Sequence, residues 1–172
     1  MWDCDYFTKQ MYDKPWNQPL MIDWTREFPN GSYAHYAEPR HSTQAISEEA
    51  VDVIKAHASH KTEKRLFLYV SYTAGHSPLQ PLLNDQNKCK HIPHLWRQQF
   101  CGLVVGLDEG IYTVTEAAEH FLGRNTLVIV SSDNGGSPWF GGLNTPLRGS
   151  KMTPFEGGIK VRDKAPVVTI YQ

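Results

Sequence analysis

The sequence predicts an α/β fold that contains a strand–helix–strand unit with parallel strands. Two short apolar runs, Leu66–Tyr72 and Thr126–Ser131, have the length and composition of strands buried on both faces. Between them, apolar residues recur at helical spacing over roughly Leu95–Leu122. A strand, a long helix and a second strand in this order form a right-handed crossover, so we expect the two strands to be parallel.

The size and composition of the chain are those of a globular domain or of a substantial part of one. It has 172 residues, of which 40% are hydrophobic and 20% charged, so a packed core is expected. The 17 basic and 18 acidic residues nearly cancel, which gives no electrostatic reason to expect a nucleic-acid partner. No apolar run has the length of a membrane span. The acidic start at Met1–Tyr6 is not a secretory signal, so either the protein is cytosolic or its true beginning is missing.

The segments outside this unit are expected to be one further helix and irregular connections. In residues 1–45 the apolar residues recur at neither helical nor strand spacing, so this segment is expected to be irregular, with or without a short hairpin. A helix is expected to begin at Ser47, because Ser47 can cap it and Glu48 and Glu49 suit its positive end. After the first predicted strand, we expect a loop and then a polar stretch as far as about Pro93.

Two polar clusters follow the two predicted strands, at the point where each strand ends. One contains His76, and the other contains Asp133 and Asn134 at the start of a long glycine-rich loop. Ligands bind outside the carboxyl ends of parallel strands, so we expect these three residues to face one crevice. The oxygens of Asp133 and Asn134 suit calcium or magnesium better than zinc. An Asx turn that closes the strand explains the same two residues, and a lone loop histidine is more often a hydrogen-bonding residue than a catalyst.

The stretch SDNGGSPWFGGLNTPLRGSKMTPFEGG, Ser132–Gly158, resembles the signature of sulfatases of the arylsulfatase B type. In that family a strand runs into Asp-Asn-Gly-Gly, followed by a glycine- and asparagine-rich loop, Pro-Leu-Arg-Gly-x-Lys and Glu-Gly-Gly. Leu66–Tyr69 and the downstream His76–Gln80 resemble the family's strand and histidine loop. Phe100–Val104 resembles the start of the helix between them, and all of these segments occur in the family's order and spacing.

This resemblance implies a fold and a domain organisation. The fold is the mostly parallel, helix-covered α/β sheet of sulfatases and alkaline phosphatases. Residues 1–172 are expected to be a partial domain of that kind, with its family core at residues 46–160. Residues 161–172 diverge from the family, because Lys160 replaces a usual arginine and charged residues follow where an apolar strand would start.

The same resemblance implies an activity and its residues. The activity is calcium-dependent hydrolysis of sulfate esters, including those of sulfated glycans, in a lysosomal or secreted protein. By position, Asp133 and Asn134 correspond to two calcium ligands. Lys151 corresponds to the lysine that binds the sulfate, and His76 to the histidine beside the leaving ester oxygen. These residue types suit the hydrolysis of a sulfate ester. A cation and an ammonium stabilise charge on sulfate oxygens, and an imidazolium can protonate the leaving group.

Some motifs of the family do not occur in this sequence. The family's nucleophile is a formylglycine made from the cysteine of a Cys-x-Pro-Ser-Arg motif, and Cys4, Cys89 and Cys101 all lack that context. Two upstream calcium-binding aspartates and a Gly-Lys-Trp-His-type motif would precede residue 1. We therefore expect a truncated chain or an incomplete gene model that is inactive alone. A non-catalytic decoy and a phosphate-ester hydrolase are the alternatives, and Asn134 favours a sulfatase because the phosphatase branch usually has a histidine there.

Three smaller features have more than one interpretation. Cys89 and Cys101, with two histidines between them, have the residue types of a zinc site, but a Cys89–Cys101 disulfide in an exported parent is favoured. The sequon at Asn30 would be glycosylated only in a secreted protein. Trp139 and Phe140, in the glycine-rich loop, either line a substrate cleft or fill the loop, and the sequence does not separate these roles.

Overall fold

The computed structural model describes residues 41–60, 64–123 and 125–160, together with the backbone of three short strands outside them. Internal contacts divide the chain into two units, residues 1–40 and 41–172. In the first unit, β1 (Thr25–Glu27) pairs antiparallel with β2 (Tyr33–His35), which is the short hairpin that the sequence allowed. The sequon at Asn30 and the thiol of Cys4 lie outside the described residues.

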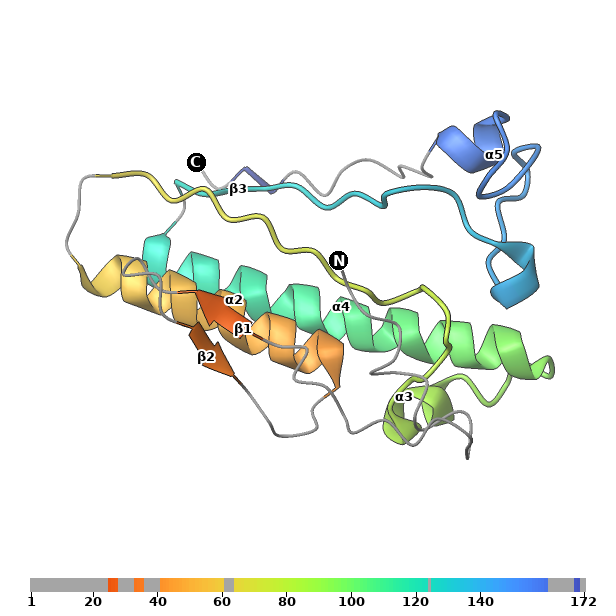
Figure 1. Ribbon diagram of the computed structural model, residues 1–172, viewed down its shortest axis with the longest axis horizontal. Coiled ribbons are helices and arrows are strands. Elements are labelled where there is room, and N and C mark those ends of the chain that lie inside the picture. The colour runs from red at the N-terminus through yellow and green to blue at the C-terminus, as the bar shows by residue number, and fades with distance from the viewer. Residues whose placement is uncertain are drawn as a thin grey trace. The chain divides into compact units, whose positions relative to one another are not determined.

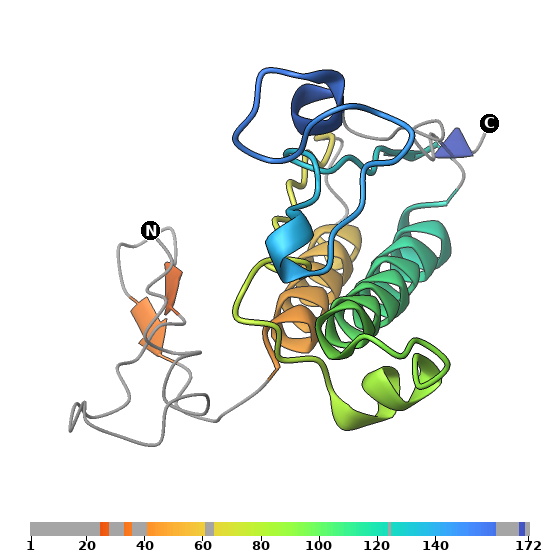
Figure 2. The same ribbon diagram turned by 90° about the vertical axis from the view of Figure 1, so that its right-hand side faces the viewer.

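Two long helices, α2 (Ser42–Ser59) and α4 (Leu95–Leu122), lie side by side in the second unit (Figures 1 and 2). Helix α4 has the bounds that its apolar period predicted, and Gly123, with φ of 75°, ends it. The core lies where the two helices meet, and the first predicted strand packs against it. Its members are Ile54, Ala117 and Ala118, with Val51, Leu66, Leu68, Val114 and Leu122 packed around them.

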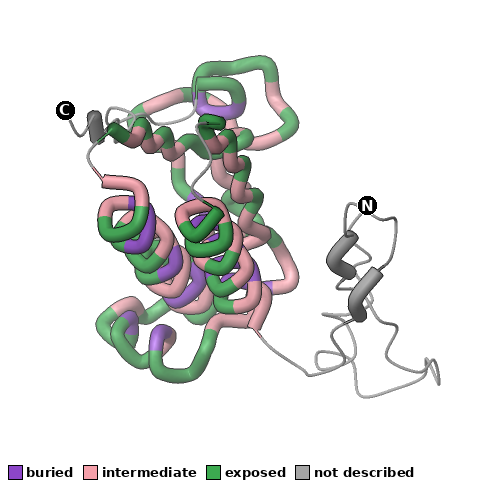
Figure 3. The backbone as a smooth tube through the Cα atoms, turned by 90° about the vertical axis from the view of Figure 1, so that its left-hand side faces the viewer, coloured by how far each residue is buried: buried purple, intermediate pink, exposed green. Residues whose placement is uncertain are grey.

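Both helices are amphipathic, with their buried residues on the sides that face each other (Figure 3). The exposed side of α2 carries mainly charged and polar residues, whereas α4 also exposes apolar side chains such as Trp96, Val104 and Tyr112. Among the described residues, no helix has both the length and the apolar character needed to cross a membrane.

Helix α2 begins at Ser42, ahead of the start predicted at Ser47. Ser47 is buried inside the helix, where its hydroxyl donates to the Thr43 carbonyl at 2.8 Å and lies 2.9 Å from the Tyr72 hydroxyl. The prediction of a cap at Ser47 was therefore wrong, because this hydroxyl bonds the carbonyl four residues back instead of the helix end. Burial raises the pKa of the Tyr72 hydroxyl, and the bond with Ser47 lowers it by less.

The two predicted strands are extended segments that run in the same direction on one side of the helices (Figure 1). In the second segment only β3 (Leu127–Val128) is a strand, and it pairs antiparallel with β4 (Thr169–Ile170). Within the described residues, the first segment has no strand pairing. The common direction agrees with a parallel crossover, although the two segments do not pair directly with each other.

One face of these segments is exposed. The side chains of Phe67 and Tyr69 are 91% and 81% exposed, and Leu127 and Ile129 are exposed as well. The intervening residues are half-buried on the side of the helices. The prediction that both segments are buried on both faces was wrong, because the described helices cover only one face and the apolar content of the segments cannot show which faces are covered.

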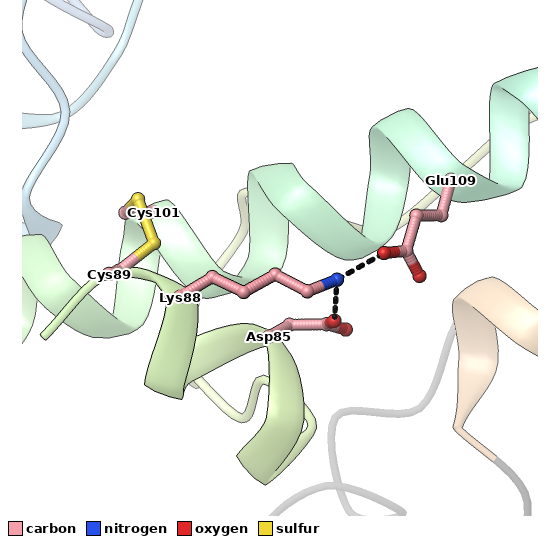
Figure 4. A network of polar contacts seen from close by, with 5 residues as sticks. All are labelled: Asp85, Lys88, Cys89, Cys101 and Glu109. Atoms are coloured by element: carbon pink, nitrogen blue, oxygen red, sulfur yellow. Dashed lines mark hydrogen bonds and ion pairs between the residues drawn. A yellow bond between two sulfur atoms is a disulfide. The ribbon is translucent and has the colours of Figure 1, made fainter.

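A short helix, α3 (Leu83–Lys88), lies in the stretch that the sequence analysis described only as polar. Two links attach it to α4 (Figure 4): the Cys89–Cys101 disulfide, and Lys88, which pairs with Asp85 at 3.3 Å and with Glu109. The carboxylates of Glu109 and Asp85 raise the pKa of the Lys88 ammonium. The prediction missed α3 because these links stabilise a helix too short and polar for a periodic signal.

The disulfide also decides between the two interpretations of the cysteines. Cys89 and Cys101 are bonded to each other, which confirms the favoured pairing. Both thiols are consumed in that bond, so neither can supply the thiolate that a zinc site at these residues would require.

Candidate active site

The four predicted site residues lie on two loops. The histidine loop, residues 73–80, follows the first extended segment, and the glycine loop, residues 133–158, follows the second. Both segments lead toward the end of the unit where α4 begins (Figure 1). Their position at the carboxyl ends of two segments of common direction is the arrangement that the sequence predicted for a binding crevice.

Both loops contact the first turns of α4. A side chain at Gly75 in the histidine loop would have its Cβ 3.8 Å from the Phe100 ring, and the Arg97 guanidinium lies 5.5 Å from the centre of that ring. The same guanidinium donates a hydrogen bond to the Gly141 carbonyl in the glycine loop. Phe100 and Arg97 therefore connect the two loops through one helix end.

His76 is exposed, and its own loop orients the ring. Nδ1 lies 2.7 Å from the carbonyl oxygen of Ser77, and the backbone N–H of His76 donates to Thr73. A carbonyl can only accept, so a neutral ring carries its proton on Nδ1 and leaves Nε2 with a free lone pair. A protonated ring has a second hydrogen on Nε2, which can be donated to a leaving oxygen.

Asp133 and Asn134 present oxygens that nothing in the described residues engages. Asp133 is exposed and Asn134 half-buried, and neither side chain has a hydrogen bond or an ion pair in the described part of the chain. The Asx-turn interpretation would require such a side-chain bond to the backbone. Instead the hydroxyl of Ser132 donates to the Asn134 carbonyl at 2.8 Å and shapes the turn.

This pair suits calcium as part of a site. Calcium takes six to eight oxygen ligands, and carboxylate and amide oxygens are among those it prefers. Asp133 and Asn134 therefore have the right chemistry. Across the described residues, however, no group of three or more histidine, cysteine, aspartate or glutamate side chains could hold a metal ion. The remaining ligands of a complete calcium site would have to come from elsewhere.

Lys151 lies in the second limb of the glycine loop and is half-buried. Its backbone N–H donates to the Gly136 carbonyl at 3.3 Å, and its ammonium has no ion pair within the described residues. The next residue, Met152, has φ of 71°, a conformation that costs free energy for any residue but glycine. Ser150 and Thr153 fix this turn through three mutual hydrogen bonds of 2.8 to 3.0 Å. The ammonium is thus available to an anion.

A close approach of two backbones holds the Asp-Asn-Gly-Gly turn against the other end of the glycine loop. The Gly135 N–H donates to the Gly158 carbonyl at 3.0 Å. A Cβ at Gly135 would lie 1.8 Å from the Gly157 carbonyl oxygen, so no other residue fits without displacing that segment. This contact joins the Asp-Asn-Gly-Gly and Glu-Gly-Gly sequences at the two ends of the glycine loop.

Asn144 connects the two limbs of the glycine loop, and sequence reasoning missed it. Its side-chain oxygen accepts from the Gly136 N–H at 2.7 Å, and its amide nitrogen donates to the carbonyls of Gly136 and Gly149 at 2.8 and 3.3 Å. Gly136 also receives the bond from Lys151. The sequence contains one indication of this role, an asparagine among glycines. A side-chain amide can both donate to and accept from backbone groups, so it can join two loop segments.

Replacing Asn144 by alanine is expected to lower the free energy of unfolding by about 1 to 3 kcal/mol, because it leaves the Gly136 N–H and the Gly149 carbonyl without this partner, while the Gly136 carbonyl keeps its bond from Lys151. Chemical denaturation of both proteins measures the difference. Asn144→Asp is the matched control, since it keeps the acceptor and loses the donor, and we expect an intermediate value. Equal stability of Asn144→Ala and the parent would show that Asn144 does not hold the loop.

Comparison with known proteins identifies the family. A profile of the family described as Sulfatase matches residues 2–161. The chain belongs to the sulfatase family. It is 39% identical over 135 residues to arylsulfatase J of Mus musculus and 30% identical over 158 residues to N-acetylgalactosamine-6-sulfatase of Homo sapiens. These alignments cover 78% and 84% of this chain but only 21% and 27% of the two relatives, so the chain spans about a quarter of their length.

A solved structure of similar fold agrees with this membership. The crystal structure of Ps i-CgsB in complex with k-i-k-neocarrahexaose matches this chain with a TM-score of 0.70 and 26% sequence identity. The match covers 93% of this chain and 34% of the other. The predicted sulfatase-like α/β fold is thereby confirmed, as part of a larger domain. The profile begins matching at residue 2, ahead of the family core expected from residue 46.

Proposed function

We propose that this chain belongs to a calcium-dependent sulfuric ester hydrolase that acts on sulfated glycans. The family match carries this proposal, because it coincides with an unpaired Lys151 ammonium on the loop that begins at Asp133 and Asn134. Solvated surface lysines are common, but this lysine is half-buried in a fixed turn and bonded to the same loop through its backbone.

In this proposal each residue has a defined role. The Lys151 ammonium binds a sulfate oxygen and stabilises its negative charge. The protonated His76 ring donates the Nε2 hydrogen to the ester oxygen as the sulfur–oxygen bond breaks. Asp133 and Asn134 are two of the calcium ligands, and calcium supplies further positive charge beside the sulfate when it is bound.

The 172 residues are proposed to lack activity by themselves. A covalent mechanism needs a nucleophile, and none of the four assigned site residues has that role. Cys89 and Cys101 form a disulfide, and Cys4 lacks the Pro-Ser-Arg context of a formylglycine precursor. Binding and orientation of the sulfate would remain with this part of the chain.

Two observations support a glycan substrate and an exported protein. Ps i-CgsB was crystallised with a neocarrahexaose, and another relative is named for N-acetylgalactosamine, so both relatives are associated with sugars. Disulfides form and persist in oxidising compartments, and Cys89–Cys101 is such a bond. We therefore propose a lysosomal or secreted glycoprotein.

The proposed roles are tested in a longer chain that includes the nucleophile motif. His76→Ala and Lys151→Ala are each expected to lower kcat/KM for an aryl sulfate about a hundredfold, because each removes charge stabilisation or proton transfer in the transition state. Lys55→Ala, an exposed lysine on α2, is the matched control and should retain activity. Retained activity in both site variants would contradict the proposed roles.

Calcium binding by the 172-residue chain is expected to be weak, with a Kd in the millimolar range, because ligand charge and number set affinity and only two ligands are assigned. Isothermal titration with calcium, before and after Asp133→Ala, measures it. A submicromolar site that disappears in Asp133→Ala would contradict this expectation. The longer chain, which supplies the upstream aspartates, is expected to bind calcium more tightly.

A further inference from the structure

We propose that Trp139 is the surface on which a sugar ring of the sulfated substrate stacks. This inference rests on the proposed function, since it assigns the part of the site that would hold the glycan beside its sulfate group. Trp139 is the middle residue of η1 (Pro138–Phe140), a single turn inside the glycine loop.

The turn that carries Trp139 is firmly attached to α4, while the indole itself is exposed. Phe140 stacks on Trp96 of α4, with ring centres 6.1 Å apart and planes 16° from parallel. The carbonyl of Gly141 accepts from Arg97. A Cβ at Gly141 would lie 2.8 Å from the Trp96 carbonyl oxygen, and its φ of 83° also favours glycine. The Trp139 side chain nevertheless remains 79% exposed.

The base of this turn is joined directly to the predicted sulfate site. The Gly142 N–H donates to the Ser137 carbonyl at 2.9 Å and closes the turn. The neighbouring Gly136 carbonyl accepts from the backbone N–H of Lys151 at 3.3 Å. Trp139 is therefore held on the backbone segment that also holds the ammonium proposed to bind sulfate.

A sulfated sugar ring suits this combination better than free sulfate does, because it offers a ring face to the indole as well as a charge to the ammonium. The face of a sugar ring presents C–H groups with slight positive charge, and the face of an indole carries negative charge density, so the two attract. The exposed indole and the Lys151 ammonium belong to one hydrogen-bonded loop, which suits a sugar ring that carries a sulfate on one side. The first interpretation of Trp139, as a residue that fills the loop, does not account for its exposure.

The test measures binding to the 172-residue chain by isothermal titration, with three probes. They are a sulfated galactose hexasaccharide, the same hexasaccharide without sulfate, and inorganic sulfate. Trp139→Ala is expected to weaken binding of the sulfated hexasaccharide about tenfold and to leave inorganic sulfate unchanged. Trp139→Phe should recover part of the loss, because it restores an aromatic face. Leu143→Ala removes a comparably exposed apolar side chain from the same loop and should have no effect.

The outcomes separate this inference from the proposed function. Unchanged hexasaccharide affinity in Trp139→Ala, with sulfate binding lost in Lys151→Ala, overturns the Trp139 assignment and leaves the proposed function intact. Binding of the hexasaccharide that depends on Trp139 but not on Lys151 or on sulfate supports the sugar surface and contradicts the proposed sulfate site. Self-association that Trp139→Ala abolishes, without any saccharide binding, would assign the surface to a second copy of the chain and overturn the inference.

Discussion

Purified residues 1–172 are expected to hydrolyse an aryl sulfate at least a thousandfold more slowly than a chain extended upstream through a Cys-x-Pro-Ser-Arg motif. Electrostatic groups that bind and neutralise a sulfate accelerate hydrolysis only partly when the covalent step is lost, as removal of a nucleophile from other enzymes shows. His76 and Lys151 supply such groups, but neither provides a formylglycine. We therefore expect at most a residual rate.

The measurement is turnover of a chromogenic aryl sulfate with calcium present, by protein purified away from the sulfatases of the expression host. The longer chain with its motif cysteine changed to alanine is the matched control, since it keeps every other residue. Turnover by residues 1–172 that disappears in both His76→Ala and Lys151→Ala would show that this chain has a nucleophile of its own. Activity in neither the short nor the longer chain would contradict the proposed function.

The parts of the fold that the sequence predicted are those with a long, regular pattern. Helix α4 repeats its apolar residues at helical spacing over many turns and ends at a glycine. The spacing predicted the helix, and the spacing together with the glycine predicted its bounds. Ser47 has the residue type of a cap but lies inside α2, because tertiary contact with Tyr72 decides its role. Local propensity cannot show such a contact.

The strand pairing and the burial of the two extended segments depend on which other segments pack against them, and the residues of a segment alone do not show this. Phe67 and Tyr69 have strand-forming side chains, and the segment is extended as predicted. Their high exposure shows that the described helices cover one face only. A run of consecutive apolar residues indicates that a segment is suited to burial on two faces, but it does not show what covers either face.

For the candidate site, the sequence predicted residues with distinctive chemistry and missed those that position them. His76 and Asp133 were predicted from their position after the two predicted strands, and Lys151 from the family resemblance. All three lie on two loops that contact one end of α4. Their convergence in a single crevice stays a prediction. Asn144 and Arg97 hold the glycine loop through bonds to backbone carbonyls, and such bonds leave no spacing pattern in a sequence.

Removing the Cys89–Cys101 disulfide is expected to lower the free energy of unfolding by about 3 kcal/mol, because the bond closes a short loop and restricts the unfolded chain. The two cysteines are 12 residues apart, and the bond attaches α3 to α4. Cys101 adjoins Phe100 in the part of α4 that contacts the histidine loop. We therefore expect the loss to affect the site as well as stability.

Chemical denaturation of the Cys89→Ala, Cys101→Ala double variant and of its parent measures this difference, and the double change avoids a lone thiol. Lys88→Gln is the matched control, because it removes the other link between α3 and α4 at an exposed side chain and should change stability much less. Reducing agent should destabilise the parent and leave the double variant unchanged, since only the parent has a bond to break. Equal stability of parent and double variant under oxidising conditions would show that the disulfide does not restrict the unfolded chain, and that packing alone holds α3 in place.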